Sequence, residues 1–181
     1  MDDDATFPLP VFGVIGPPNS GKTTLLCAVI AELSAAGWRV GVIKQAAARF
    51  DLDYPGKDSF ELRRAGLRHT LLASERRAAW ITEHPEETSP TLAALLGQLD
   101  WRRLDVVLVE GFADAACAKL EVVPQGQRPR RYPADDRVIA LVTAAPTPDA
   151  FPAAPAVLDL DQPTAVTAFI AGRCRGLAPD C

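Results

Sequence analysis

The sequence predicts an α/β fold in which a mostly parallel β-sheet is covered by helices on both faces. Two observations predict it. Short apolar segments alternate with segments of helical periodicity, and a glycine-bounded turn connects the first apolar segment to the first helix. A chain of 181 residues has the length of one compact domain. We therefore predict a single domain over residues 1–181, with residues 1–9 as a flexible N-terminal segment.

The turn after the first strand carries the clearest functional signal. The apolar strand 11–15 runs into the segment Gly16-Pro17-Pro18-Asn19-Ser20-Gly21-Lys22-Thr23, and an amphipathic helix follows as far as Ala36, before Gly37. A strand, a glycine-bounded loop ending in lysine and threonine, and a helix form in this order the P-loop that cradles phosphate. The predicted fold is therefore a P-loop NTPase-like three-layer sandwich.

The residue types in this loop suit a nucleoside triphosphate. The backbone N–H groups of residues 19–23 and the positive end of the helix can bind phosphate oxygens, and the two glycines allow the backbone to approach them. Lys22 is expected to reach the β- and γ-phosphates, Thr23 to ligate Mg²⁺ and Thr24 to contact the α-phosphate. The predicted nucleotide-binding residues of the loop are Gly16, Asn19, Ser20, Gly21, Lys22, Thr23 and Thr24.

A carboxylate is predicted beside this loop, because the carboxyl ends of parallel strands meet at one edge of a sheet. Glu110 ends the continuous apolar run 105–110, which is typical of a strand buried on both faces. We predict that Glu110 acts with Lys22 in catalysis and supports the Mg²⁺ ion, either directly or through a water molecule. Gly111 is expected to present its N–H group to the γ-phosphate.

Two residues further along the same edge are weaker candidates. Lys44 ends the predicted strand 39–44 and is expected to contact phosphate or another anion; simple solvation is the alternative. Asp51 lies in the loop 45–58, which is rich in small and acidic residues, and is predicted as a metal ligand when the loop closes. A solvated acidic loop is the alternative there.

A short helix is predicted after this loop. Asp58 and Glu61 have the spacing of a capping box that opens the helix, and Gly66 closes it. Arg63 and Arg64 are expected to face solvent or a partner.

The rest of the chain follows the same alternation of strands and helices. Residues 69–74 and 78–82 are predicted to pair as an antiparallel hairpin around a turn at 75–77. The apolar spacing of residues 88–99 predicts a helix with its leucines facing inward. The remaining predicted elements are strands over 119–123, 138–142 and 157–160 and a helix over 164–171.

The composition argues against several classes of protein. The net charge of −4 is unlike that of a nucleic-acid-binding surface, and no apolar run approaches the about 20 residues of a membrane span. The acidic start of the chain differs from a secretory signal, so a cytoplasmic location is predicted. The four cysteines form no C-x-x-C pair, Cys27 is expected to be buried, and His69 and His84 are isolated. We therefore expect no zinc, redox or imidazole-based catalytic site.

Beyond these motifs, the chain resembles the MobB family of molybdopterin guanine dinucleotide biosynthesis. The resemblance spans residues 11–123, and its specific part is Asp51-Leu52-Asp53-Tyr54-Pro55-Gly56-Lys57-Asp58-Ser59, since a P-loop alone fits many families. The other matching segments are Val42-Ile43-Lys44, Phe60-Glu61-Leu62-Arg63-Arg64-Ala65-Gly66, Leu71-Leu72-Ala73-Ser74, Leu108-Val109-Glu110-Gly111-Phe112 and Lys119-Leu120-Glu121-Val122.

The resemblance implies a GTP-binding protein of the SIMIBI class, usually a homodimer with weak GTPase activity. It also implies Mg²⁺ as a cofactor, a guanylyltransferase of the MobA type as partner, and contact with molybdopterin. The chain departs from the family pattern at two places: residues 45–49 lack the histidines common after the second-strand lysine, and Ala113 replaces a frequent lysine. No Asn-Lys-x-Asp element follows strand 138–142, so the preference for GTP over ATP rests on the resemblance.

Two other functions stay open at this stage. A small-molecule kinase would close the basic loop containing Arg128, Arg130 and Arg131 over the transferred phosphate, although a solvated loop explains these residues more simply. A SIMIBI-type delivery protein for a metal would need clustered cysteine or histidine ligands. No strong water-activating base stands out, and this favours an adapter with slow GTP hydrolysis.

Overall fold

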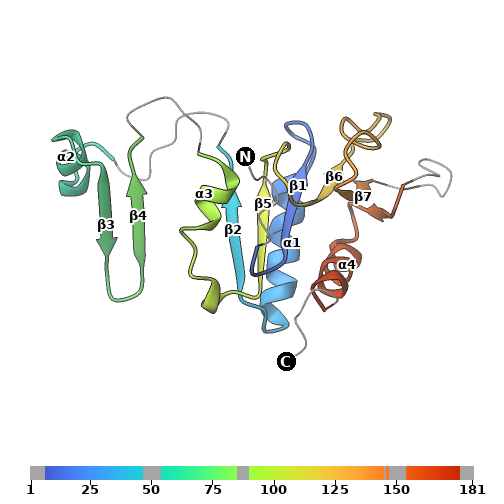
Figure 1. Cartoon of the computed structure of the whole chain (residues 1–181), viewed down its shortest axis with the longest axis horizontal. Helices are drawn as coiled ribbons and strands as arrows, with labels where there is room; N and C mark the ends of the chain where they lie inside the picture. Colours follow the sequence, from blue (N-terminus) through green and yellow to red (C-terminus); the bar gives the residue numbers. More distant parts are fainter. Residues whose placement is uncertain (1–6, 47–53, 85–89, 145, 147–153, 176–181) are drawn as a thin grey trace. The chain divides into compact units, whose positions relative to one another are not determined.

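The first strand of the chain lies in the middle of a six-stranded parallel sheet (Figure 1). The computed structural model describes residues 7–46, 54–84, 90–144, 146 and 154–175. The strand order is β2-β5-β1-β6-β7-β8, and every neighbouring pair is parallel. These strands are β1 (Val11–Ile15), β2 (Val40–Lys44), β5 (Val106–Glu110), β6 (Ala118–Val122), β7 (Val138–Thr143) and β8 (Val157–Asp159).

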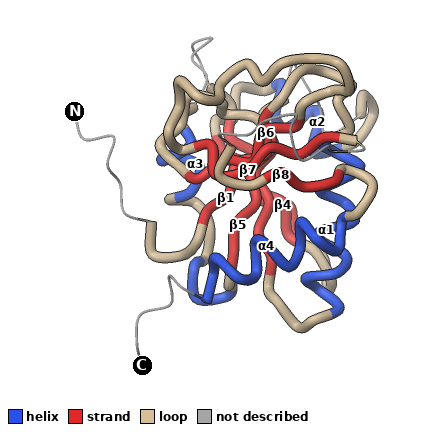
Figure 2. The backbone as a smooth tube through the Cα atoms, turned by 90° about the vertical axis from the view of Figure 1, so that its right-hand side faces the viewer, coloured by secondary structure: helices blue, strands red, loops and turns tan. Residues whose placement is uncertain are grey.

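Helices cover both faces of this sheet. One face packs against α1 (Lys22–Ala35) and α4 (Pro163–Arg175), and the other against α3 (Leu92–Leu96) and the 3₁₀ helix η1 (Trp101–Arg103). In Figure 2, α3 lies across the strands from α1 and α4. The predicted three-layer α/β sandwich is therefore confirmed.

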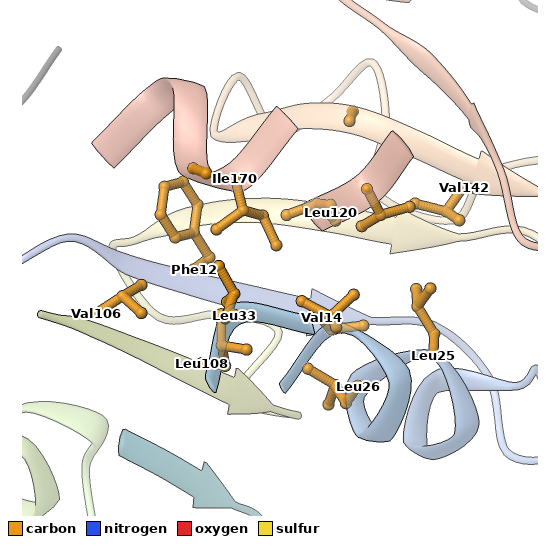
Figure 3. Close-up of a cluster of buried hydrophobic side chains, with 14 of the residues drawn as sticks. Phe12, Val14, Leu25, Leu26, Leu33, Val106, Leu108, Leu120, Val142 and Ile170 are labelled. Atoms are coloured by element: carbon orange, nitrogen blue, oxygen red, sulfur yellow. The ribbon is translucent and has the colours of Figure 1, made fainter. Parts of the chain in front are cut away.

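The larger hydrophobic core fills the space between the sheet and helices α1 and α4. Figure 3 shows Leu33 of α1 and Ile170 of α4 beside Phe12 of the central strand, and each of the three side chains is 1% exposed. Residues 106–109 of β5 are 0% exposed and alternate between this core and the one beneath α3. This pattern confirms the prediction that the apolar run is a strand buried on both faces of the sheet.

Two buried charged side chains of β6 hold the loop that follows it. Lys119 is 0% exposed and Glu121 is 1% exposed. The Lys119 ammonium lies 2.9 Å from the carboxylate of Asp135, and the Glu121 carboxylate accepts hydrogen bonds from the backbone N–H groups of residues 130–132. Because loop N–H groups have no ladder partners, a buried carboxylate supplies the acceptors that the loop needs.

Residues 46–90 form a separate compact unit. Its described part contains α2 (Asp58–Arg64) and the strands β3 (His69–Ala73) and β4 (Ala78–Thr82), which pair in antiparallel register. The predicted hairpin is thereby confirmed. The single domain over the whole chain stays a prediction.

The predicted capping box of α2 is wrong. The N-cap residue is Lys57, with extended backbone angles and no side-chain cap, and Asp58 is the first helical residue. The reason is a turn just before the helix, in which Gly56 has a φ of 90° and the Lys57 N–H bonds to the Tyr54 carbonyl oxygen at 3.2 Å. Asp58 and Glu61 still lie in the first turn, where carboxylates interact favourably with the helix dipole.

Two other helices differ in length from the prediction. The helix expected over 88–99 is α3, which ends at Leu96. After the Gly97 N–H, the N–H groups of Gln98 and Leu99 bond three residues back instead of four, so the helix tightens and stops there. Residues 88 and 89 lie outside the described part. The last helix, α4, starts at Pro163, a residue type well suited to the first helical position, and runs to Arg175.

Cys27 and Phe7 both differ from what the sequence predicts. Cys27 is exposed on α1 rather than buried, because the buried positions of that helix are occupied by Leu25, Leu26, Val29 and Leu33. Residues 1–6 of the expected flexible segment lie outside the described residues, whereas Phe7 packs against the core beneath α3. No helix in the described part of the chain is both long enough and apolar enough to cross a membrane.

Candidate nucleotide-binding site

The turn between β1 and α1 has the backbone of a phosphate-binding loop. Gly16, Asn19 and Gly21 have φ values of 143°, 58° and 91°. A Cβ atom on Gly16 would lie 2.5 Å from the carbonyl oxygen of Val122, so glycine is required where the loop leaves the sheet. Gly21 caps α1 without a side-chain hydrogen bond, and the first N–H groups of the helix remain available to an anion.

The Lys22 ammonium lies over this loop. It donates a hydrogen bond to the Pro17 carbonyl oxygen at 2.6 Å and lies 3.4 Å from the hydroxyl of Ser20, a side chain that is 7% exposed. Burial lowers the pKa of Lys22, the nearby Glu110 carboxylate raises it, and the Lys44 ammonium lowers it. A cation that is partly withdrawn from water gains more from an anionic ligand than a fully solvated one.

Three predicted residues from separate elements meet at the carboxyl edge of the sheet. The Thr23 hydroxyl on α1 lies 3.0 Å from both carboxylate oxygens of Glu110 at the end of β5. The Lys44 ammonium at the end of β2 lies 3.2 Å from Glu110 Oε2 and 3.3 Å from Thr23 Oγ1. This arrangement follows from the parallel register, which pairs Lys44 with Glu110 and Val14 with Glu110 on neighbouring strands.

The oxygens of Thr23 and Glu110 fit a Mg²⁺ ion. Hydroxyl and carboxylate oxygens are the ligands that this cation prefers, and neighbouring ligands around an octahedral Mg²⁺ lie about 3 Å apart. The Thr23 hydroxyl oxygen and the Glu110 carboxylate oxygens are 3.0 Å apart, which matches this spacing. Asp51, the third predicted ligand, lies outside the described residues. Among the described residues, no three His, Cys, Asp or Glu side chains gather as a metal site.

Gln45 is a site residue that the sequence interpretation missed. Its backbone N–H bonds to the Glu110 carbonyl oxygen at 2.9 Å, and its side-chain oxygen accepts the Phe112 N–H at 2.8 Å. Gly111 and Phe112 both have positive φ, 97° and 51°, which is uncommon for phenylalanine. Gln45 therefore stabilises the tight turn that follows the Glu110 carboxylate.

The expected role of the Gly111 N–H group was wrong. That group donates to the carbonyl oxygen of Val14 at 3.3 Å and continues the sheet instead of facing a phosphate. Asn19 and Thr24, in contrast, are exposed, one in the loop and one on the first turn of α1. Both are therefore accessible to a ligand at this edge.

The basic loop after β6 is held in place by an ion pair and by hydrogen bonds from its backbone. The Arg131 guanidinium pairs with the Asp114 carboxylate at 2.6 Å, while its backbone N–H bonds to Glu121. Arg128 and Arg130 are exposed. A loop held by a buried carboxylate is poorly suited to close over a transferred phosphate, which weakens the kinase alternative.

The chain is similar to proteins of molybdopterin guanine dinucleotide synthesis. The model of the family described as MobB, molybdopterin guanine dinucleotide synthesis protein B, matches residues 11–144. The molybdopterin-guanine dinucleotide biosynthesis adapter protein of Escherichia coli K12 is 40% identical over 140 residues, which cover 76% of this chain and 80% of that protein. The protein of the same name from Haemophilus influenzae is 38% identical over 138 residues, 76% of each chain.

Solved structures of MobB proteins share the fold. The Bacillus subtilis MobB structure aligns with a TM-score of 0.70 at 22% identity, covering 93% of this chain and 99% of that one. Another MobB crystal structure aligns with a TM-score of 0.66 at 24% identity, covering 90% and 99%. With the family model matching most of the chain and two relatives at about 40% identity, the protein belongs to the MobB family.

Proposed function

We propose that this chain is a GTP-binding adapter of molybdopterin guanine dinucleotide synthesis. In this proposal it binds GTP and Mg²⁺ at the turn between β1 and α1, hydrolyses GTP slowly, and assists a guanylyltransferase of the MobA type. The adapter role is supported by family membership and by relatives named as adapter proteins. The homodimer, the contact with molybdopterin and the cytoplasmic location stay predictions.

The main support for a nucleotide site is that Thr23 and Glu110 lie in contact beside Lys22. A hydroxyl from the start of α1 and a carboxylate from the end of β5 lie 3.0 Å apart, next to a loop whose glycines leave its backbone open to phosphate. The Mg²⁺ ion would be held by these two oxygens together with phosphate oxygens, and it would neutralise negative charge on the phosphates. The Lys22 ammonium would bind the same phosphates from the loop side.

Slow hydrolysis is consistent with the contacts of Glu110. A general base must be able to accept a proton from the attacking water. The Glu110 carboxylate instead accepts the Thr23 hydroxyl and pairs with the Lys44 ammonium at 3.2 Å. We therefore assign Glu110 to the metal, and expect GTP turnover to be slow without the partner.

Calorimetric titration with GTP and ATP, each with and without Mg²⁺, tests the proposal. We expect GTP to bind in the micromolar range, about −8 kcal/mol, more tightly with Mg²⁺ than without it, and more tightly than ATP. Adding a purified MobA-type guanylyltransferase should yield a complex. Equal affinity for both nucleotides would contradict the assignment of GTP, and no binding of either would contradict the site.

Replacing Glu110 with alanine should remove the benefit of Mg²⁺ rather than nucleotide binding itself. We expect the increase in GTP affinity caused by Mg²⁺ to fall about tenfold, which is 1.4 kcal/mol, because the ion loses a protein ligand. Affinity measured without Mg²⁺ should change little. Glu75→Ala removes the same charge from the exposed turn of the hairpin and should change neither value. Lost nucleotide affinity with an unchanged Mg²⁺ effect would rule out the metal role.

A further inference from the structure

A cavity in the unit formed by residues 46–90 has the character of an anion site. Its volume is about 450 Å³, within the range of small-molecule sites. Residues of α2, the segment 66–68 and Glu83, just after β4, line it. The side chains that define its chemistry are Phe60, Arg63, Arg64, Leu67, Arg68 and Glu83.

The cavity carries an excess of positive charge. Three arginines and one glutamate line it, which leaves a net charge of +2. The Arg63 guanidinium, 13% exposed, pairs with the Glu83 carboxylate at 2.7 Å, contrary to the expectation that it faces solvent or a partner. Arg64 and Arg68 are exposed and form no ion pair within the described part of the chain. The excess charge therefore belongs to these two guanidinium groups.

An apolar wall lies beside the two uncompensated arginines. Leu67 is 43% exposed, and the guanidinium carbons of Arg63 and Arg64 each lie 5.9 Å from the centre of the Phe60 ring. An exposed leucine and a half-buried phenylalanine next to arginines match a ligand that is anionic at one end and apolar at the other.

The walls of this cavity are held by two contacts that span the unit. The Arg63–Glu83 ion pair joins α2 to the end of the hairpin, and the Glu83 N–H bonds to the Arg68 carbonyl oxygen at 2.9 Å. Gly66, with a φ of 105°, ends α2 and turns the chain toward Arg68. The cavity is thus formed by the fold of the unit itself.

We propose that this cavity binds a small phosphate monoester with a flat or apolar body. Arg64 and Arg68 hold the phosphate through charge-assisted hydrogen bonds, and Leu67 with Phe60 contacts the body. This site is separate in sequence from the P-loop, and its existence does not depend on nucleotide binding there. A simpler explanation of Arg64 alone is that it offsets the negative end of the α2 dipole, but Arg68 lies beyond the helix.

Phenyl phosphate is a suitable probe, with inorganic phosphate and phenol as its two halves. In amide NMR spectra of the full chain, phenyl phosphate should shift the signals of Gly66, Leu67 and Arg68. It should bind at least fivefold more tightly than inorganic phosphate or phenol. Arg64→Ala and Arg68→Ala should each weaken its binding at least fivefold. Arg76→Ala, which removes one charge from the exposed turn of the hairpin, should weaken it less than twofold.

Three results would overturn the proposal. Shifts confined to the amides of residues 21–23 would place the probe at the P-loop and leave the nucleotide proposal untouched. Equal losses in Arg64→Ala and Arg76→Ala would indicate a nonspecific response to charge. If the Arg64→Ala and Arg68→Ala variants were less stable than the wild type but bound phenyl phosphate with unchanged affinity, the two arginines would serve the fold alone.

Discussion

Replacing Lys22 with alanine is expected to weaken GTP binding at least 100-fold, about 2.7 kcal/mol, while the fold stays intact. The ammonium lies over the loop and would make charge-assisted hydrogen bonds to the phosphates, each about 1.5–3 kcal/mol. Among the described residues, its hydrogen bonds reach only Pro17 and Ser20 of the same loop. Losing them should cost little stability. Isothermal titration calorimetry measures the first effect and far-UV circular dichroism the second.

Lys57→Ala is the matched control for this variant. Lys57 is exposed, lies in the unit of residues 46–90, and caps α2 without a side-chain hydrogen bond. Its replacement removes the same charge from the protein, so it should leave GTP affinity within twofold of the wild type. If Lys22→Ala binds GTP as tightly as Lys57→Ala does, the assignment of the loop as the nucleotide site is refuted.

Replacing Glu121 with alanine is expected to lower the free energy of unfolding by about 3 kcal/mol. The carboxylate is 1% exposed and is the acceptor for backbone N–H groups of residues 130–132, at 3.1 Å for Arg131 and 3.0 Å for Tyr132. Alanine leaves these donors without their acceptor and opens space beneath the loop. Urea denaturation at constant pH measures the loss.

Glu121→Gln separates the hydrogen bonds from the charge. Glutamine keeps one acceptor oxygen and nearly the same volume, so it should cost about 1 kcal/mol, well below the alanine variant. Glu75→Ala, on the exposed hairpin turn, should be neutral. A Glu121→Ala protein as stable as the wild type would mean that water satisfies the loop and that the carboxylate does not anchor it.

The elements predicted well from the sequence are those that local signals specify. The P-loop depends on glycines whose positive φ the structure shows at residues 16 and 21, and on the helical spacing that follows them. The hairpin depends on two short apolar strands separated by a charged turn. Lys44 and Glu110 were placed correctly at one edge because parallel strands share their direction.

The features that sequence interpretation missed depend on contacts between distant residues. Gln45 bonds to Phe112, 67 positions away, and nothing in its own neighbourhood indicates this contact. Lys119 and Glu121 alternate with apolar residues along β6. This alternation is typical of a strand with one face exposed to solvent. Only the loop folded over that face makes both positions buried.

The α2 segment shows how a local pattern can mislead. The Asp58–Glu61 spacing fits a capping box, but the preceding turn moves the start of the helix by one residue. Arg63 has the sequence context of a solvent-facing residue, yet it pairs with Glu83 on the other side of the hairpin. In both cases a contact outside the helix decided the outcome.

In the proposed function, the backbone between β1 and α1 binds the triphosphate. Amide NMR spectra of the wild-type protein, titrated with GTP and Mg²⁺, locate the bound nucleotide residue by residue. We expect the largest shifts at the N–H signals of Gly21, Lys22 and Thr23, with smaller shifts at Lys44 and Glu110. Saturable GTP binding that leaves the signals of residues 19–24 unchanged would contradict the claim.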